Sequence, residues 1–142
     1  MTHNSAQKTV LFLCNSNKGK SQMAAGLAEK IMPEWEIHSA GVQVVAPGEQ
    51  GSINQESAAS LEEVGADMSQ GTPKPVDPQI LRTADAVIIV GGAHLDWPAD
   101  AQGELIRWDT PEPSTQGIEG MERMRIIRDD IEARIRELAD KQ

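Results

Sequence analysis

The sequence of 142 residues has few aromatic side chains and a single cysteine. Phe12 and three tryptophans make up the whole of its Phe, Trp and Tyr content, since tyrosine is absent. Aliphatic side chains and six methionines must therefore fill the core. Because Cys14 is the only thiol, no internal disulfide can form, which favours a reducing, cytoplasmic setting.

The chain also lacks a long apolar run and an excess of basic residues. No run reaches the ~18 residues needed to cross a bilayer, and the N-terminal MTHNSAQK has no apolar signal-peptide core. A formal charge of -9 argues against nucleic acid or an anionic membrane as a partner. A small anion is still a possible ligand, because its site needs only a local positive field.

What is present fits a single soluble domain spanning residues 1–142. Hydrophobic residues make up 39% of the chain and charged residues 25%, which is typical of globular proteins. Short apolar runs predict strands at 9–13, 36–40, 86–91 and 104–108. Apolar residues spaced three and four apart predict helices at 23–31, at 55–64 and from 119 onward, with a short helical turn at 78–82.

Two irregular stretches separate these elements. Residues 42–54 are rich in Gly, Gln and small side chains, and residues 67–78 contain three prolines, so both are expected to be loops. Strands that alternate with helices predict an α/β three-layer sandwich with a mostly parallel sheet. Ligands bind beyond the C-terminal ends of the strands in such sheets, which is where the loop after the first strand would lie.

That loop is part of VLFLCNSNKGKSQ, residues 10–22, and two interpretations of it compete. Gly19-Lys20-Ser21 could end an ATP-binding loop, but Cys14 occupies the position where GxxxxGK[ST] requires its first glycine. The strand AVIIV also ends in Gly-Gly, without the acidic residue that would hold magnesium. We therefore favour an oxyanion-binding loop built around a nucleophilic thiol.

The residue types of the loop suit that chemistry. A helix start offers unpaired N–H groups and a partial positive charge, which would bind a tetrahedral oxyanion and stabilise the Cys14 thiolate. Lys20 adds a positive charge, Ser21 can donate a hydrogen bond to sulfur, and Asn17 can brace the loop from inside. Plainer interpretations exist: Cys14 as an inert buried thiol, Lys20 as an ordinary surface lysine, and Asn17 and Ser21 as a turn residue and a helix cap.

The loop C-N-S-N-K-G-K-S resembles the C-x5-R-S loop of low-molecular-weight protein tyrosine phosphatases and of the thiol-based arsenate reductases that share their fold. With Lys in place of Arg, it is most similar to the arsenate-mycothiol transferases. The resemblance extends over nearly the whole chain, through EIHSAG, EVGADMSQG, DPQILRTADAVIIVG and GMERMRIIRD at residues 36–41, 63–71, 77–91 and 120–129.

The resemblance implies a four-stranded parallel sheet flanked by helices, with Cys14 as nucleophile. It implies that the loop binds the oxyanion through Asn15, Ser16, Asn17, Lys18, Gly19 and Lys20. It also implies a general acid before a proline, which is Glu112 or Asp109 in DTPEP. The chain departs from the phosphatases here, because Glu-Pro-Ser replaces Asp-Pro followed by an aromatic residue. Acidic residues beside prolines are also common in plain surface loops.

The departures from the family pattern point to the reaction. Guanidinium grips two oxygens of a phosphate in a planar fork, whereas the Lys20 ammonium is a point charge. Thioredoxin-coupled relatives carry two further cysteines near the third strand, where this chain has Gly91, Gly92 and Trp97. An external thiol must therefore resolve any intermediate.

The expected function is an arsenate-detoxifying enzyme that forms an arseno-mycothiol adduct. Its partners would be arsenate, mycothiol as thiol co-substrate and a mycoredoxin downstream, with no bound cofactor and no metal. A low-molecular-weight tyrosine phosphatase and a non-catalytic anion-binding or redox-sensing module remain the alternatives.

Overall fold

The computed structural model describes residues 7–44 and 53–141. In chain order they form strand β1 (Thr9–Cys14), helix α1 (Lys20–Ile31), strand β2 (Glu36–Gly41), helices α2 (Gln55–Glu62) and α3 (Pro78–Thr83), strands β3 (Ala86–Val90) and β4 (Glu104–Trp108), the 3-10 helix η1 (Pro113–Gln116) and helix α4 (Gly120–Asp140). No helix in these two ranges is long and apolar enough to cross a membrane.

The four strands form one parallel sheet in the order β2-β1-β3-β4. The chain runs from β1 to one neighbour, β2, and later returns to the other side of β1 as β3. In parallel sheets, such a reversal of strand order opens a crevice at the carboxyl ends of the two central strands. β1 ends at Cys14, which pairs with Gly41 at the end of β2. The sheet topology thus places Cys14 at the mouth of that crevice.

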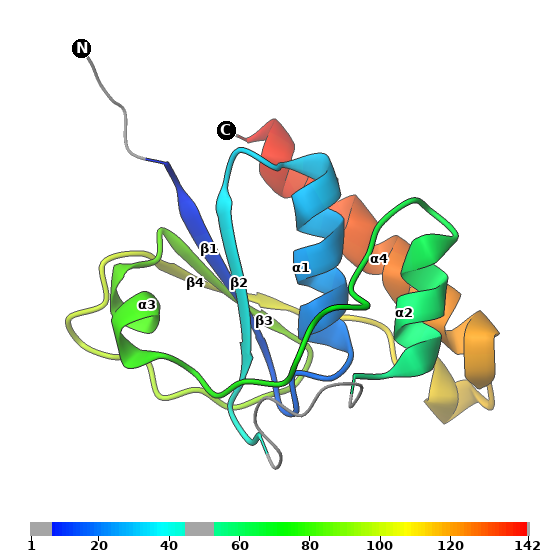
Figure 1. Cartoon of the computed structure of the whole chain (residues 1–142). Coiled ribbons are helices and arrows are strands. Elements are labelled where there is room, and N and C mark those ends of the chain that lie inside the picture. Colours follow the sequence, from blue (N-terminus) through cyan, green and yellow to red (C-terminus); the bar gives the residue numbers. More distant parts are fainter. Residues whose placement is uncertain (1–6, 45–52, 142) are drawn as a thin grey trace.

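Helices cover both faces of the sheet, with α1, α2 and α4 on one face and α3 on the other (Figure 1). The residues of β1 alternate between these two layers. Val10 and Phe12 belong to the cluster that includes the apolar sides of α1 and α4, whereas Leu11 and Leu13 pack with Leu81 of α3. The predicted three-layer sandwich with a four-stranded parallel sheet is therefore confirmed. All six residues of β1 except Thr9 are buried, as expected of a central parallel strand.

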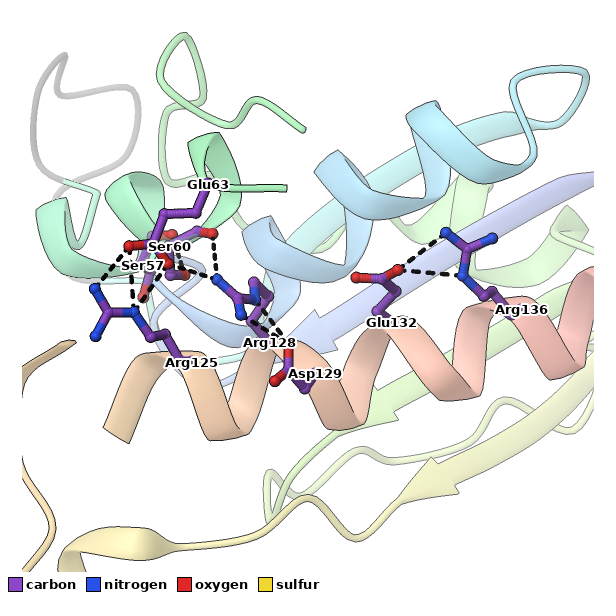
Figure 2. A network of polar contacts seen from close by, with 8 residues as sticks. All are labelled: Ser57, Ser60, Glu63, Arg125, Arg128, Asp129, Glu132 and Arg136. Atoms are coloured by element: carbon purple, nitrogen blue, oxygen red, sulfur yellow. Dashed lines mark hydrogen bonds and ion pairs between the residues drawn. The ribbon is translucent and has the colours of Figure 1, made fainter. Parts of the chain in front are cut away.

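Helix α4 packs across α1 and α2 through the apolar stripe that its sequence predicts, with Met124, Ile127, Ile131 and Ile135 buried. Ion pairs reinforce its contact with α2 (Figure 2). Glu63, just after α2, accepts from Arg125 at 2.7 Å and from Arg128 at 2.8 Å. Hydrogen bonds from Arg125 and then Arg128 lower the pKa of the Glu63 carboxyl from 4.5 to about 2. While it is paired with the two arginines, the Glu63 carboxyl therefore stays ionised down to a pH of about 2.

The predicted elements are present; the strand at 104–108 has the predicted bounds, and no end of the other elements shifts by more than three residues. The second helix ends at Glu62, and the first begins at Lys20, before its first apolar residue. Most of the loop expected at 42–54 lies outside the described residues. The proline-rich stretch 67–78 is irregular as expected, although Pro75 forms an isolated bridge with Gly41. The short η1 was not predicted, because four residues carry no periodicity.

Candidate active site

Cys14 lies at the junction of β1 and the loop that leads into α1, with only 8% of its surface exposed. Two groups contact its sulfur. The backbone N–H of Asn17 donates to Sγ at 3.2 Å, and the Ser21 hydroxyl lies 2.9 Å from it. The Asn17 side-chain amide donates to the same hydroxyl oxygen at 2.7 Å. The hydroxyl keeps its own proton, which it can donate to the sulfur when Cys14 is ionised.

The loop is held in shape from inside by Asn17. This residue is fully buried and adopts a left-handed conformation with φ 57°, which turns its N–H toward the sulfur. Its side-chain oxygen accepts from the backbone N–H of Lys74 at 3.0 Å and from the Gln22 amide at 3.2 Å. Asparagine adopts this conformation more readily than most residues. The structure is thus consistent with the bracing role that the sequence suggests for Asn17.

The loop also packs against the end of β2, where Gly41 allows a close approach. A Cβ atom at residue 41 would lie 2.7 Å from the backbone oxygen of Asn15 and 3.0 Å from the backbone nitrogen of Asn17. Both are backbone atoms, so neither can turn aside. Gly41 therefore allows the close approach of the loop to the sheet in which the Asn17 N–H reaches the Cys14 sulfur.

The start of α1 is left open to a ligand. Gly19 precedes the helix and has no side chain with which to cap the N–H groups of the first turn. Such uncapped N–H groups and the helix dipole form a site for an anion. Cys14, Asn15, Ser16, Lys18, Gly19 and Lys20 all line one cavity at this point. The predicted oxyanion loop thus faces a cavity, with Asn17 behind it.

Lys20 and Glu112 face each other across the rim of this cavity. The Lys20 ammonium donates to the Glu112 carboxylate at 2.7 Å, with 20% of the lysine side chain and 52% of the glutamate side chain exposed. Gly91, at the end of β3, makes room for the lysine. Its φ of +104° disfavours any other residue, and a Cβ there would lie 3.3 Å from the Lys20 nitrogen. Of the Gly-Gly pair after the third strand, Gly91 is therefore the residue that leaves room for the lysine.

The cavity has a volume of about 540 Å³ and a positive lining in an acidic protein. Its charged residues are Lys18, Lys20 and Arg123 against one acid, Glu112. Met124 and Ile127 of α4 complete one wall. A net positive lining attracts anions locally even where the whole molecule is negative.

The structure separates the two candidate acids. Glu112 lines the cavity with Cys14, whereas Asp109 does not and exposes its side chain to solvent. The backbone oxygen of Asp109 accepts from Arg134 of α4. This placement favours Glu112 for any role that needs contact with a ligand. Ser21 lies beneath the sulfur and is fully buried.

Several residues of the site carry no motif in the sequence. Gln22 follows the loop directly, yet only its hydrogen bonds to Asn17 and to Thr72 reveal a role. Lys74 reaches the loop from 57 positions away, and burial lowers the pKa of its ammonium group. Arg123 lies in the last helix, and only the folded structure shows that it lines the same cavity as the first loop.

Comparisons of the sequence and of the structure with known proteins both find arsenate reductases among the similar proteins. The model of the low molecular weight phosphotyrosine protein phosphatase family matches residues 9–142. An arsenate reductase of Bacillus licheniformis is 34% identical over 145 residues, which covers 95% of this chain and 97% of that protein.

Two solved structures are also similar. An arsenate reductase in a phosphate-binding state is 27% identical with a TM-score of 0.77, and the match covers 95% of this chain and 98% of that chain. A thioredoxin-dependent arsenate reductase of Corynebacterium glutamicum is 28% identical with a TM-score of 0.73, over 96% of this chain and 62% of that one.

Proposed function

The chain belongs to the low molecular weight phosphotyrosine protein phosphatase family, and on that premise we propose that it is an arsenate reductase that uses Cys14 as nucleophile and mycothiol as external thiol. The observation that carries the proposal is the position of the Cys14 sulfur. It lies within hydrogen-bond distance of Asn17 N–H and Ser21, at the base of a loop that faces a cation-lined cavity. Arsenate reductases among its relatives support arsenate as the substrate.

The first step would be attack of the Cys14 thiolate on arsenic. A sulfur–arsenic bond forms, one arsenic–oxygen bond breaks, and the oxygen leaves as water after it takes up protons. Glu112 would transfer a proton to that oxygen, a role supported by its place in the cavity lining beside Lys20. Uncapped N–H groups at the start of α1 would stabilise the charge on the remaining oxygens. Arsenic stays at oxidation state five.

An external thiolate would then attack the same arsenic and displace Cys14. This second exchange forms the arseno-mycothiol adduct and returns the enzyme thiolate. Reduction would follow outside the protein: the thiolate of a mycoredoxin attacks the mycothiol sulfur, arsenic keeps the electron pair of the broken bond, and arsenite leaves. The absence of a second cysteine supports an external thiol, since no internal disulfide can drive the release.

The replacement of arginine by Lys20 supports arsenate over phosphoesters. An ammonium group offers a point charge where guanidinium would hold two oxygens at once. Arsenate exchanges its ligands faster than phosphate does, so it depends less on such a clamp. We therefore expect weak phosphatase activity beside arsenate turnover.

The test is arsenate-dependent turnover with two reducing systems compared. We expect activity with mycothiol and a mycoredoxin, little activity with thioredoxin and its reductase, and none with Cys14→Ser in either system. Turnover with thioredoxin alone would replace mycothiol in the proposal. Efficient hydrolysis of an aryl phosphate without arsenate turnover would make the protein a phosphatase, and oxidation of Cys14 without any turnover would make it a sensor.

A further inference from the structure

The cavity at Cys14 is larger than arsenate requires. Its volume of about 540 Å³ falls in the range of pockets that hold whole organic ligands, roughly 300 to 1,000 Å³. The loop from Cys14 to Lys20 forms one side of it, and the beginning of α4 forms another through Arg123, Met124 and Ile127. A tetrahedral oxyanion held by the loop would leave the α4 side free for a second molecule.

Arg123 has hydrogen-bonding capacity that the protein does not use. Its Nε is buried and makes no hydrogen bond in the part of the chain that the structure describes. Its nearest acidic neighbour, Glu119, stands 3.8 Å from Nη1, beyond hydrogen-bond distance. Buried polar atoms are nearly always satisfied in native proteins, so an unpaired guanidinium nitrogen beside a cavity calls for a ligand.

Two arginines further along α4 behave differently. Arg125 donates to Glu63 at 2.7 Å, and Arg128 donates to both Glu63 and the backbone oxygen of Ser60 at 2.8 and 2.9 Å (Figure 2). Neither of them lines the cavity. The arginines at 125 and 128 thus tie α4 to the end of α2, whereas Arg123 lines the cavity and has a buried Nε without a hydrogen-bond partner among the described residues.

We propose that Arg123 binds the thiol co-substrate and so determines which thiol resolves the arsenic intermediate. This inference rests on the proposed function. The ligand class is a cysteine-derived low-molecular-weight thiol, held through its amide carbonyl or carboxylate oxygens by the planar fork of the guanidinium. The sulfur of this thiol would then reach arsenic from the α4 side, while the loop and Lys20 hold the oxyanion. Arg123 forms and breaks no covalent bond.

Kinetics with the whole protein test the assignment. In Arg123→Met, which keeps the apolar stem, we expect KM for mycothiol to rise about tenfold at saturating arsenate, the loss of one or two charge-assisted hydrogen bonds. The KM of Arg123→Lys for mycothiol should lie between those of the wild type and Arg123→Met, because lysine keeps the positive charge but lacks the planar guanidinium. KM for arsenate should stay the same in both. Arg136→Met is the matched control, since Arg136 is exposed and paired with Glu132 one turn away.

A binding measurement separates failure of this inference from failure of the proposed function. S-methyl mycothiol cannot react, so calorimetry with it reports recognition even if the enzyme shows no turnover. We expect it to bind the wild-type protein and Arg136→Met, and to bind Arg123→Met about tenfold more weakly. Absent binding, equal binding to all three proteins, or a rise in KM for arsenate instead of the thiol would each overturn the inference. If the wild-type protein binds S-methyl mycothiol but shows no arsenate turnover, only the proposed reaction is refuted.

Discussion

The Ser21 hydroxyl takes part in two hydrogen bonds, one with the Asn17 amide and one with the Cys14 sulfur. The Asn17 amide donates to its oxygen at 2.7 Å, and the hydroxyl can donate its own proton to the sulfur 2.9 Å away when Cys14 is ionised. A donor of this kind stabilises the thiolate, which is the nucleophilic form. At the scale of one residue, the reactivity of Cys14 should therefore depend on a side chain that never touches the ligand cavity.

The substitution Ser21→Ala tests that dependence. Removing a hydrogen bond worth about 1 kcal/mol should slow alkylation of Cys14 by iodoacetamide at neutral pH about fivefold. Every alkylated sulfur in the protein is Cys14, because the chain has no other cysteine. Ser69→Ala, in an exposed loop, is the control. Equal alkylation rates in the two variants would show that Ser21 acts only in packing.

Lys20 provides a second test at the residue scale. Lys20→Arg would add a second hydrogen bond to a bound oxyanion, so phosphate should inhibit the variant about fivefold more strongly, a gain of about 1 kcal/mol. Lys141→Arg, at the far end of α4, controls for the added guanidinium. An unchanged inhibition constant for phosphate would mean that Lys20 pairs with Glu112 even when the anion is bound.

At the scale of elements, the contact between α2 and α4 depends on a carboxylate that stays ionised to low pH. The pKa of Glu63 is lowered from 4.5 to about 2 by Arg125 and Arg128. A carboxyl group whose pKa is depressed on folding contributes stability that is present above its unfolded value, and this contribution is lost as the pH falls through about 2. The effect is modest, because the Glu63 side chain is 39% exposed and water screens it.

The variant Glu63→Gln should accordingly melt below the wild type at pH 6 to 8, and the difference should shrink as the pH drops below 4.5. High salt should reduce the difference too. Glu62→Gln is the matched control, because Glu62 is the exposed neighbour of the same type, and Arg125 and Arg128 pair with Glu63 instead. A melting difference that persists unchanged at pH 2 would assign the role of Glu63 to shape and not to charge.

The elements were predictable where the sequence carries a period or an unbroken apolar run. VLFL and AVIIV give buried parallel strands, and the spacing of Met124, Ile127, Ile131 and Ile135 gives the long helix. The 3-10 helix η1 has neither signal. In the site, the loop itself was readable because its chemistry is contiguous in sequence. Lys74 and Arg123 were not, because only the folded chain brings them to residues 14–20. Gln22 is adjacent in sequence, but its hydrogen bond to Asn17 is visible only in the structure.

For the whole molecule, the loop is connected to distant segments and should report ligand binding globally. Asn17 joins the loop to Lys74, and Gly41 joins it to β2 and Pro75. An anion at about 100 times its Kd should stabilise the fold by about 2.7 kcal/mol, which raises Tm by roughly 5 to 10 °C. Scanning calorimetry with arsenate or sulfate against sodium chloride of equal ionic strength measures this. Equal Tm values in all three salts would contradict binding at the loop.

The ion pair between Lys20 and Glu112 should affect which anions bind in the cavity. A singly charged anion such as chloride or nitrate that displaces the Glu112 carboxylate from Lys20 would only replace one counter-ion of the lysine by another of the same charge. A doubly charged tetrahedral anion brings a further unit of charge, which Lys18 can neutralise. We therefore expect the cavity to prefer doubly charged over singly charged anions, so that abundant monovalent anions compete poorly.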